Sequence, residues 1–183
     1  MRPIVKHILQ SWCHAIEISG PVWEFGSFQV DGPEDDLRPI FAGLEYVGCD
    51  MRPGPGVDKI RNLLKLKIPA NSIGTAVCVD TFEHVENPFR AIQEIHRVLR
   101  PGGLLFLISV MNFPIHYEPD YWRFTPGGFE KLLVGPFTSG KVFSMGGTVT
   151  HPETIAGIAG KGILLNHIAD WEKKFESHFL ASA

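Results

Sequence analysis

The sequence predicts an α/β fold, a Rossmann-like three-layer αβα sandwich whose sheet is mostly parallel with an antiparallel pair at one edge. Short apolar runs alternate with segments of helical periodicity, which is the order of elements in a doubly wound sheet. Residues Ile73–Val110 contain a complete crossover from strand through helix to strand, and such crossovers belong to parallel sheets. Two weaker strand patterns, Lys141–Ser144 and Thr154–Ile158, are interpreted as the antiparallel edge pair.

The crossover contains clear start and stop signals. Thr75–Val79 is an apolar run too short for a helix and is predicted to be a buried strand. Asn87 followed by Pro88 predicts an N-cap and a proline at the first helical position. The face that this helix buries is predicted to consist of Ala91, Ile92, Ile95, Val98 and Leu99. Pro101-Gly102-Gly103 should end the helix, and Leu104–Val110 is the second predicted strand.

The other expected elements continue the alternation of helices and strands. Before the crossover they are a helix at about Ile4–Ile18, a strand at Val22–Phe25, a short helix at about Asp35–Phe41 and a strand at Tyr46–Cys49. After it they are an irregular loop at Met111–Phe124, a helix from Pro126 to about Leu133 that Thr125 caps, and a helix at about Leu164–Leu180 that covers the sheet edge.

Composition indicates an ordinary globular protein. The chain of 183 residues is 44% hydrophobic and 20% charged, which predicts one domain with an N-terminal helix (1–20), a core (21–162) and a C-terminal helix (163–183). The net charge of −3, the pI near 6.2 and the absence of a basic tract argue against a nucleic-acid partner. No apolar stretch has the length of a membrane span and no signal-peptide pattern is present, so the expected location is cytoplasmic.

Cysteine and histidine spacing gives no metal signature. Cys13, Cys49 and Cys78 are far apart and form no CxxC pair, so buried free thiols are expected rather than a disulfide or a metal site. Glu83-His84 is accompanied by no HExxH or similar ligand spacing, and a His84 that braces its loop is the simpler interpretation. The sequence therefore predicts no metal.

Polar residues follow the predicted strands where a ligand site is expected. Ligands of open parallel sheets lie beyond the carboxyl ends of strands, and Asp80–His84 stands at such an end. Gly26 follows another strand and lets the backbone approach a ligand, while Glu24 can accept hydrogen bonds from a cationic or hydroxylated ligand. Asp50 ends a third strand, where a carboxylate can accept both hydroxyls of a ribose. An adenosine ligand satisfies these positions, whether S-adenosylmethionine or NAD.

The motifs EHV and NPFRAIQEIHRVLRPGG, with the apolar strand after them, resemble the class I S-adenosylmethionine-dependent methyltransferases. Val22–Gly26 is similar to the family's first strand and motif, and Leu44–Asp50 to its second strand with a terminal acid. Asp120–Pro126 resembles a segment after the fifth strand in a small bacterial subgroup. The similarity extends from about Val22 to Gly162 and implies S-adenosylmethionine as the cofactor.

The resemblance implies a set of cofactor-binding residues. They are Glu24, Gly26, Ser27, Asp50, Met51, Arg52, Asn62, Leu63, Asp80 and Thr81. Phe28 and Val30 stand where the family usually has glycines, which puts the shape of that loop in question. Asn62 stands where the subgroup commonly has an aspartate beside the adenine amino group. Its side-chain carbonyl can still accept a hydrogen bond from such an amine, or it is a plain loop asparagine.

Asn112–Arg123 is the expected acceptor-side loop, because it follows the fifth strand over the same edge and mixes aromatic with charged residues. The candidates for a catalytic role are His84, His116, Tyr117 and Tyr121. The alternative is structural: Tyr121, Trp122 and Phe124 pack on the sheet while Arg123 pairs with Asp120.

The leading hypothesis is a methyltransferase that acts by direct displacement on a small molecule or on a glycan or lipid intermediate. A methyltransferase-like binding or scaffold domain without catalysis is the alternative. An NAD-dependent oxidoreductase is disfavoured because the GxGxxG fingerprint is missing. DNA methylation is disfavoured for two reasons. Asn112–Ile115 is similar to the Asn-Pro-Pro-aromatic motif of amino-group DNA methylases, but it has one proline instead of two and follows the fifth strand instead of the fourth. The chain also has no basic face to neutralise phosphates.

Overall fold

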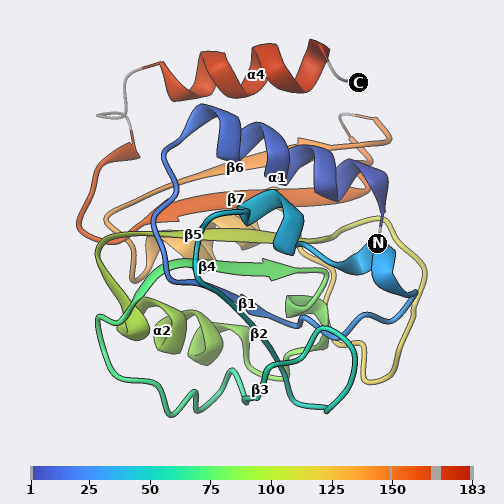
Figure 1. The fold of residues 1–183 in the computed structure, drawn as a ribbon. Helices are drawn as coiled ribbons and strands as arrows, with labels where there is room; N and C mark the ends of the chain where they lie inside the picture. Colours follow the sequence, from blue (N-terminus) through green and yellow to red (C-terminus); the bar gives the residue numbers. More distant parts are fainter. Residues whose placement is uncertain (1, 149, 166–169, 182–183) are drawn as a thin grey trace.

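The chain folds around a seven-stranded sheet in the order β3-β2-β1-β4-β5-β7-β6 (Figure 1). The computed structural model describes residues 2–148, 150–165 and 170–181. The strands are β1 (Val22–Phe25), β2 (Tyr46–Asp50), β3 (Lys59–Ile60), β4 (Ile73–Val79), β5 (Leu99–Val110), β6 (Ser139–Met145) and β7 (Thr154–Gly160). Neighbouring strands from β3 to β5 pair in parallel, whereas β7 is antiparallel to both β5 and β6. The predicted mostly parallel sheet with an antiparallel edge pair is therefore confirmed.

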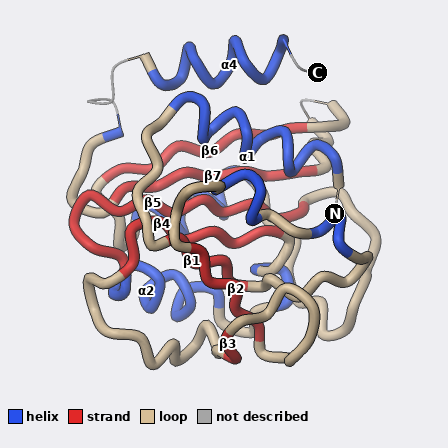
Figure 2. Tube along the Cα trace, viewed as in Figure 1, coloured by secondary structure: helices blue, strands red, loops and turns tan. Residues whose placement is uncertain are grey.

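Helices cover both faces of the sheet, and this completes the predicted three layers (Figure 2). The helical elements are α1 (Pro3–Ala15), η1 (Pro33–Asp35), η2 (Arg38–Phe41), η3 (Phe82–His84), α2 (Pro88–Val98), α3 (Pro126–Val134) and α4 (Trp171–Ala181). One core packs α1, η2 and Phe175 of α4 on one sheet face, and the other packs α2 and α3 on the opposite face. Phe175 also contacts Phe143 of β6, with ring centroids 5.0 Å apart, so α4 lies near the β6 edge.

The two helix caps that the sequence predicts are present. The Asn87 side chain accepts a hydrogen bond from the Arg90 amide, and the Thr125 hydroxyl accepts one from the Gly128 amide. Each cap satisfies one of the amides that the first helical turn leaves without a partner. These caps fix where α2 and α3 begin.

Several boundaries differ from the prediction for physical reasons. The expected helix over Asp35–Phe41 is two separate 3₁₀ turns, η1 and η2, because Pro39 has no amide hydrogen and restricts the residue before it. Leu99 is the first residue of β5 rather than the last of α2, and it pairs with Ile73. Strand β3 was not predicted, since Lys59–Ile60 is too short to show a pattern.

The first and last helices also differ from their predicted bounds of about Ile4–Ile18 and Leu164–Leu180. Helix α1 ends at Ala15, earlier than expected, and α4 begins at Trp171. Part of the expected C-terminal helix, residues 166–169, lies outside the described residues. Cys49 and Cys78 are buried, as predicted for thiols in strands. No helix in the described ranges combines the length and apolar character that crossing a bilayer requires. The single-domain division remains a prediction.

Candidate active site

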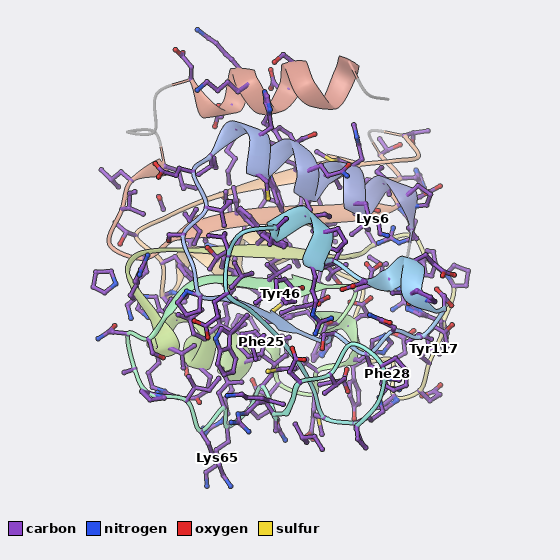
Figure 3. All side chains as sticks on the ribbon, in the orientation of Figure 1. Lys6, Phe25, Phe28, Tyr46, Lys65 and Tyr117 are labelled. Atoms are coloured by element: carbon purple, nitrogen blue, oxygen red, sulfur yellow. The ribbon has the colours of Figure 1, made fainter. Side chains whose placement is uncertain are left out.

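A cavity of about 740 Å³ lies beyond the carboxyl ends of β1, β2, β4 and β5. Every residue predicted for the cofactor lines it: Glu24, Gly26, Ser27, Asp50, Met51, Arg52, Asn62, Leu63, Asp80 and Thr81. The four catalytic candidates His84, His116, Tyr117 and Tyr121 line it as well. Phe28 and Tyr117, from loops far apart in the sequence, lie on the same side of the molecule around this cavity (Figure 3). Parallel strand ends bring these residues together.

Gly26 makes the close approach between the ends of β1 and β4 possible. Its φ is +91°, and a Cβ placed on it would lie 1.9 Å from Oγ1 of Thr81. The amides of Gly26 and Ser27 both donate to the carbonyl of Cys49, at 2.7 and 3.0 Å. Ser27 Oγ is buried and makes no hydrogen bond with the described residues, which leaves it available to a ligand.

Phe28 replaces the flexible glycine that the family pattern has at its position. The Arg52 guanidinium lies over the Phe28 ring at 4.5 Å, in the geometry of a cation–π contact. The stacked pair connects the loop after β1 with the loop after β2. A cation–π contact therefore lies at the cavity wall, where Phe28 stands in place of a glycine.

Glu24 is a buried carboxyl group with a raised pKa. It is 4% exposed, and the Tyr46 hydroxyl on the neighbouring strand donates to its Oε2 at 2.5 Å. Burial raises the pKa of Glu24 to about 7, although the Tyr46 hydrogen bond and the nearby Arg38 guanidinium act to lower it. Near neutral pH the group can therefore exchange its proton when a charged ligand arrives.

The raised pKa of Glu24 should make stability fall as pH rises. Between its ordinary pKa of 4.5 in the unfolded chain and about 7 in the folded chain, the folded state holds the extra proton. The free energy of unfolding of the wild type, relative to Glu24→Gln, should therefore drop by about 3 kcal/mol from pH 4.5 to pH 8. Urea unfolding of both proteins across this range measures the difference. Parallel curves would show that Glu24 titrates normally.

Asp50 is the last residue of β2 and lines the cavity, and its binding to a ribose remains a prediction. Its side chain is 12% exposed, and Oδ1 accepts hydrogen bonds from the Arg52 amide at 2.9 Å and from Arg52 Nε at 3.3 Å. Both contacts use Oδ1, so Oδ2 keeps its capacity to accept from a hydroxyl group. Arg52 thus holds the carboxylate in one orientation at the cavity wall.

Asn62 has a structural role in this conformation. Its Oδ1 accepts a hydrogen bond from the Leu64 amide at 2.8 Å, which closes a turn in the loop after β3. The residue is exposed, whereas its neighbour Leu63 is 8% exposed and supplies an apolar surface. The contact of Asn62 with an adenine remains a prediction.

Asp80 is paired with a residue that sequence reasoning missed. Arg2, before α1, donates to both Asp80 carboxylate oxygens, from Nη2 at 2.6 Å and from Nε at 3.3 Å. Arg2 also donates to the Thr154 hydroxyl of β7 and lies over the Phe113 ring at 5.3 Å. The two residues are 78 positions apart, and no local pattern connects them. The pair neutralises Asp80 at one end of the cavity.

The loop after β5 is held by an internal ion pair. Arg123 binds both carboxylate oxygens of Asp120, at 2.5 and 2.7 Å, and donates to the carbonyls of Phe113 and Pro114. The Arg123 guanidinium lowers the pKa of Asp120 far below its usual value. The structural alternative for these two residues is therefore confirmed. Tyr121, by contrast, stays 51% exposed and faces the cavity.

The same loop closes part of the cavity wall. The Tyr117 hydroxyl donates to Asp31 at 3.3 Å, and so joins this loop to the one after β1. Trp122 is 41% exposed, and its indole nitrogen donates to the Val85 carbonyl at 2.8 Å. Phe124 is buried in the core, as the structural alternative expects. The loop thus combines an anchored backbone with exposed aromatic rings.

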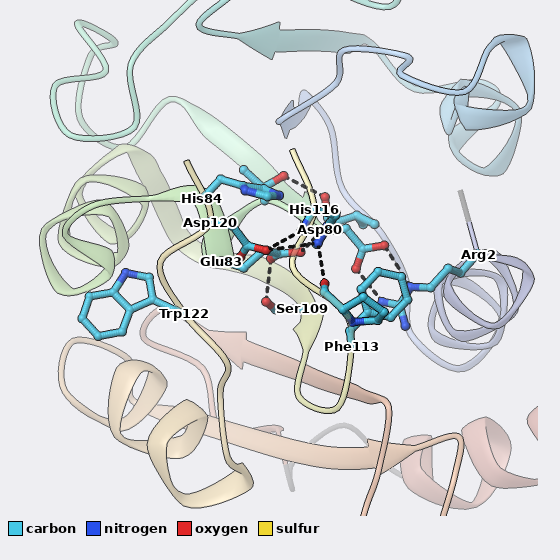
Figure 4. A network of polar contacts seen from close by, with 12 residues as sticks. Arg2, Asp80, Glu83, His84, Ser109, Phe113, His116, Asp120 and Trp122 are labelled. Carbon is cyan, nitrogen blue, oxygen red and sulfur yellow. Dashed lines mark hydrogen bonds and ion pairs between the residues drawn. The ribbon is translucent and has the colours of Figure 1, made fainter. Parts of the chain in front are cut away.

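Glu83 is a second buried acid at the site, although it was not among the residues predicted for the cofactor or for catalysis. It is fully buried; Oε2 accepts from the Ser109 hydroxyl at 2.6 Å, and Oε1 has no hydrogen-bond partner among the described residues. Burial, followed by the nearby negative charge of Asp80, raises the pKa of Glu83 to about 7. Figure 4 shows Glu83 beside His116 and above Ser109, with Arg2 reaching Asp80 nearby.

Comparison with known proteins supports one assignment. A family model described as a methyltransferase domain matches residues 43–107. No curated protein sequence matches the chain significantly. An S-adenosylmethionine-dependent methyltransferase from Archaeoglobus fulgidus superposes with a TM-score of 0.68 at 14% identity, over 88% of this chain and 95% of that one.

Two further structures show the same fold at low identity. A possible histamine N-methyltransferase from Thermotoga maritima gives a TM-score of 0.62 at 17% identity, over 86% of this chain and 92% of its own. A putative methyltransferase complexed with the Trm112 activator from Haloferax volcanii gives 0.62 at 12%, over 87% and 92%. The family match over residues 43–107, the strand order and these superpositions together show that the chain has the fold of the class I methyltransferases, and the matched structures from Archaeoglobus fulgidus and Thermotoga maritima are S-adenosylmethionine-dependent enzymes.

Proposed function

We propose that the protein is an S-adenosylmethionine-dependent methyltransferase that acts on a small molecule, or on a glycan or lipid intermediate, by direct displacement. The observation that carries this proposal is the cavity at the strand ends, where Asp50, Gly26 and Ser27 lie together. Its volume of about 740 Å³ is in the range of cofactor and small-molecule sites.

Each part of the cofactor has residues of suitable chemistry. Asp50 would accept hydrogen bonds from the ribose hydroxyls, and Leu63 and Met51 supply apolar surface for the adenine. Glu24 and Ser27, whose hydroxyl lacks a partner among the described groups, would bind the polar methionine end. The residues present therefore fit the cofactor.

The chain's contribution to the reaction is alignment and exclusion of water. The cofactor supplies a methyl group on a sulfonium, which a nucleophile can attack directly. The protein then needs to hold the acceptor in line, and at most one base needs to remove a proton. His84 and His116 line the cavity within reach of an acceptor bound there. A triad is unnecessary for this chemistry.

The acceptor side of the cavity suits a small polar molecule with a flat face. Tyr117 and Tyr121 are more than half exposed, and each offers an aromatic surface with a hydroxyl group. The subgroup resemblance is the reason for including glycan and lipid intermediates. The cytoplasmic location remains a prediction.

Calorimetry with S-adenosylmethionine, S-adenosylhomocysteine and NAD tests the proposal. Both sulfur compounds should bind, and NAD should not. Asp50→Ala should weaken their binding about 10- to 100-fold, because it removes hydrogen bonds to a charged acceptor. Asp170→Ala is the matched control, since Asp170 is an exposed acid before α4 and away from the cavity lining.

Different outcomes separate the competing hypotheses. If neither sulfur compound binds at high micromolar concentration, the protein is a methyltransferase-like scaffold domain instead. If NAD binds and they do not, the oxidoreductase hypothesis replaces ours. Unchanged affinity in Asp50→Ala would refute only the ribose assignment.

A further inference from the structure

We propose that Glu83, His84 and His116 form a binding site for one divalent transition-metal ion on the acceptor side of the cavity. One possible ligand atom from each residue lies within 4.8 Å of the other two. Glu83 and His84 belong to η3 after β4, and His116 belongs to the loop after β5. The proposal departs from the sequence prediction of no metal, because the three ligands come from two segments without a recognisable spacing.

One oxygen of the buried Glu83 carboxyl group lacks a hydrogen-bond partner among the described residues. It is fully buried, and the Ser109 hydroxyl fixes one oxygen while Oε1 has no hydrogen bond within the described chain. A buried polar atom without a partner is costly and calls for an explanation. A bound cation would supply the missing interaction.

The separation between Glu83 and His116 is close to that of two metal ligands. Glu83 Oε1 and His116 Nε2 are 3.9 Å apart. Two ligands at zinc-bond length in tetrahedral geometry lie about 3.4 Å from each other. Small side-chain rotations would therefore bring both atoms to one ion.

Both histidines are oriented as metal ligands usually are. His84 Nδ1 lies 2.8 Å from the Pro119 carbonyl, and His116 Nδ1 lies 3.2 Å from the Pro114 carbonyl and 3.3 Å from Asp120 Oδ2. These oxygens accept hydrogen bonds, which assigns the proton to Nδ1 and leaves the Nε2 lone pair free to bind. Metal-bound histidines characteristically donate their other N–H to a carbonyl or carboxylate oxygen.

A simple pair of Glu83 and His116 explains less of this arrangement. Their separation of 3.9 Å exceeds hydrogen-bond length, so no proton is shared between them in this structure. Such a pair also leaves out His84, whose ring centroid is 4.9 Å from that of His116. A metal ion accounts for all three groups.

The ligand set indicates the class of ion and its use. Two imidazoles and one carboxylate suit zinc, manganese, iron or cobalt better than magnesium or calcium. Three protein ligands leave a coordination position open, and His84 and His116 line the cavity. If the proposed function holds, this position would bind an acceptor oxygen and lower the pKa of a hydroxyl group there. Metal binding itself does not depend on that function.

Titration of the metal-stripped 183-residue chain with Co²⁺ tests the site. The expected result is one ion per chain with visible absorption bands from nitrogen and oxygen ligands. Glu83→Gln and His116→Ala should each weaken binding by at least about tenfold, as losing a ligand or its support does. His151→Ala is the control, because His151 is exposed and outside the cluster.

The outcomes are separable from those for the methyltransferase proposal. No Co²⁺ binding by the wild type, or equal binding by all variants, would overturn the metal site. If circular dichroism shows that Glu83→Gln does not fold, the Co²⁺ affinities of His116→Ala and His84→Ala test the site instead. These two variants should fold, because both histidine rings are only partly buried. The titration contains no S-adenosylmethionine, so its failure leaves the calorimetric test of the cofactor unaffected.

Discussion

Arg123→Ala should lower the free energy of unfolding by about 3 kcal/mol. The Asp120 side chain is completely inaccessible to solvent, and Arg123 supplies its opposite charge through two short hydrogen bonds. Without Arg123 this carboxylate stays buried and keeps only its contacts with the amide and the ring of His116. The carbonyls of Phe113 and Pro114 lose a donor as well. Urea unfolding of the variant and the wild type measures the loss.

The control for Arg123→Ala is an ion pair on the surface. Lys141 and Glu172 are 3.0 Å apart with side chains about half exposed, so Lys141→Ala should cost less than about 1 kcal/mol. Asp120→Ala combined with Arg123→Ala should recover part of the loss, because no unpaired charge then remains. Equal costs for Arg123→Ala and Lys141→Ala would refute the anchoring role.

Gly26→Ala should destabilise the protein by about 2–5 kcal/mol. Two effects combine at this residue, the left-handed φ of +91° and the overlap of a new Cβ with Thr81 Oγ1. The ends of β1 and β4 would have to separate, so affinity for S-adenosylmethionine should fall too. Thermal unfolding and calorimetry on the same samples measure both changes.

Gly43→Ala separates the two effects. Gly43 has nearly the same φ, +88°, but a Cβ there would meet no atom within 4 Å. Its substitution should cost only about 1 kcal/mol, the price of the left-handed backbone. Thr81→Gly in the Gly26→Ala background should recover the part caused by overlap, measured against Thr81→Gly alone. Equal losses for both alanine variants would show that the contact with Thr81 is unimportant.

The sequence predicted those features that follow from local pattern and parallel topology. Asp50 ends a strand, and Gly26 and Asp80 each follow one. Parallel strands place their carboxyl ends at one edge, so the convergence of these residues on the cavity was predictable. The caps at Asn87 and Thr125 depend on neighbours within three residues. Such short-range signals can be recognised in a single sequence.

The features that were missed depend on contacts between distant segments. Arg2 reaches Asp80 only because α1 packs across the sheet and brings its first residues to the cavity. Glu83 is notable through its burial and its partners Ser109 and His116, none of which local spacing reveals. Leu99 fits the helical period of α2, but pairing with Ile73 takes it into the sheet. Tertiary packing determined each of these outcomes.

The position of β7 between β5 and β6 affects the order in which the sheet can assemble during synthesis. In the described sheet β6 pairs with β7 alone, and β7 follows it in the chain. Strand β6 is therefore synthesised before β7, the strand that hydrogen-bonds to its backbone in the described sheet. Until Thr154–Gly160 emerges, both β5 and β6 present open edges, which are sites where nascent chains associate wrongly. Correct pairing of β5 and β6 thus depends on a strand that is synthesised after both of them.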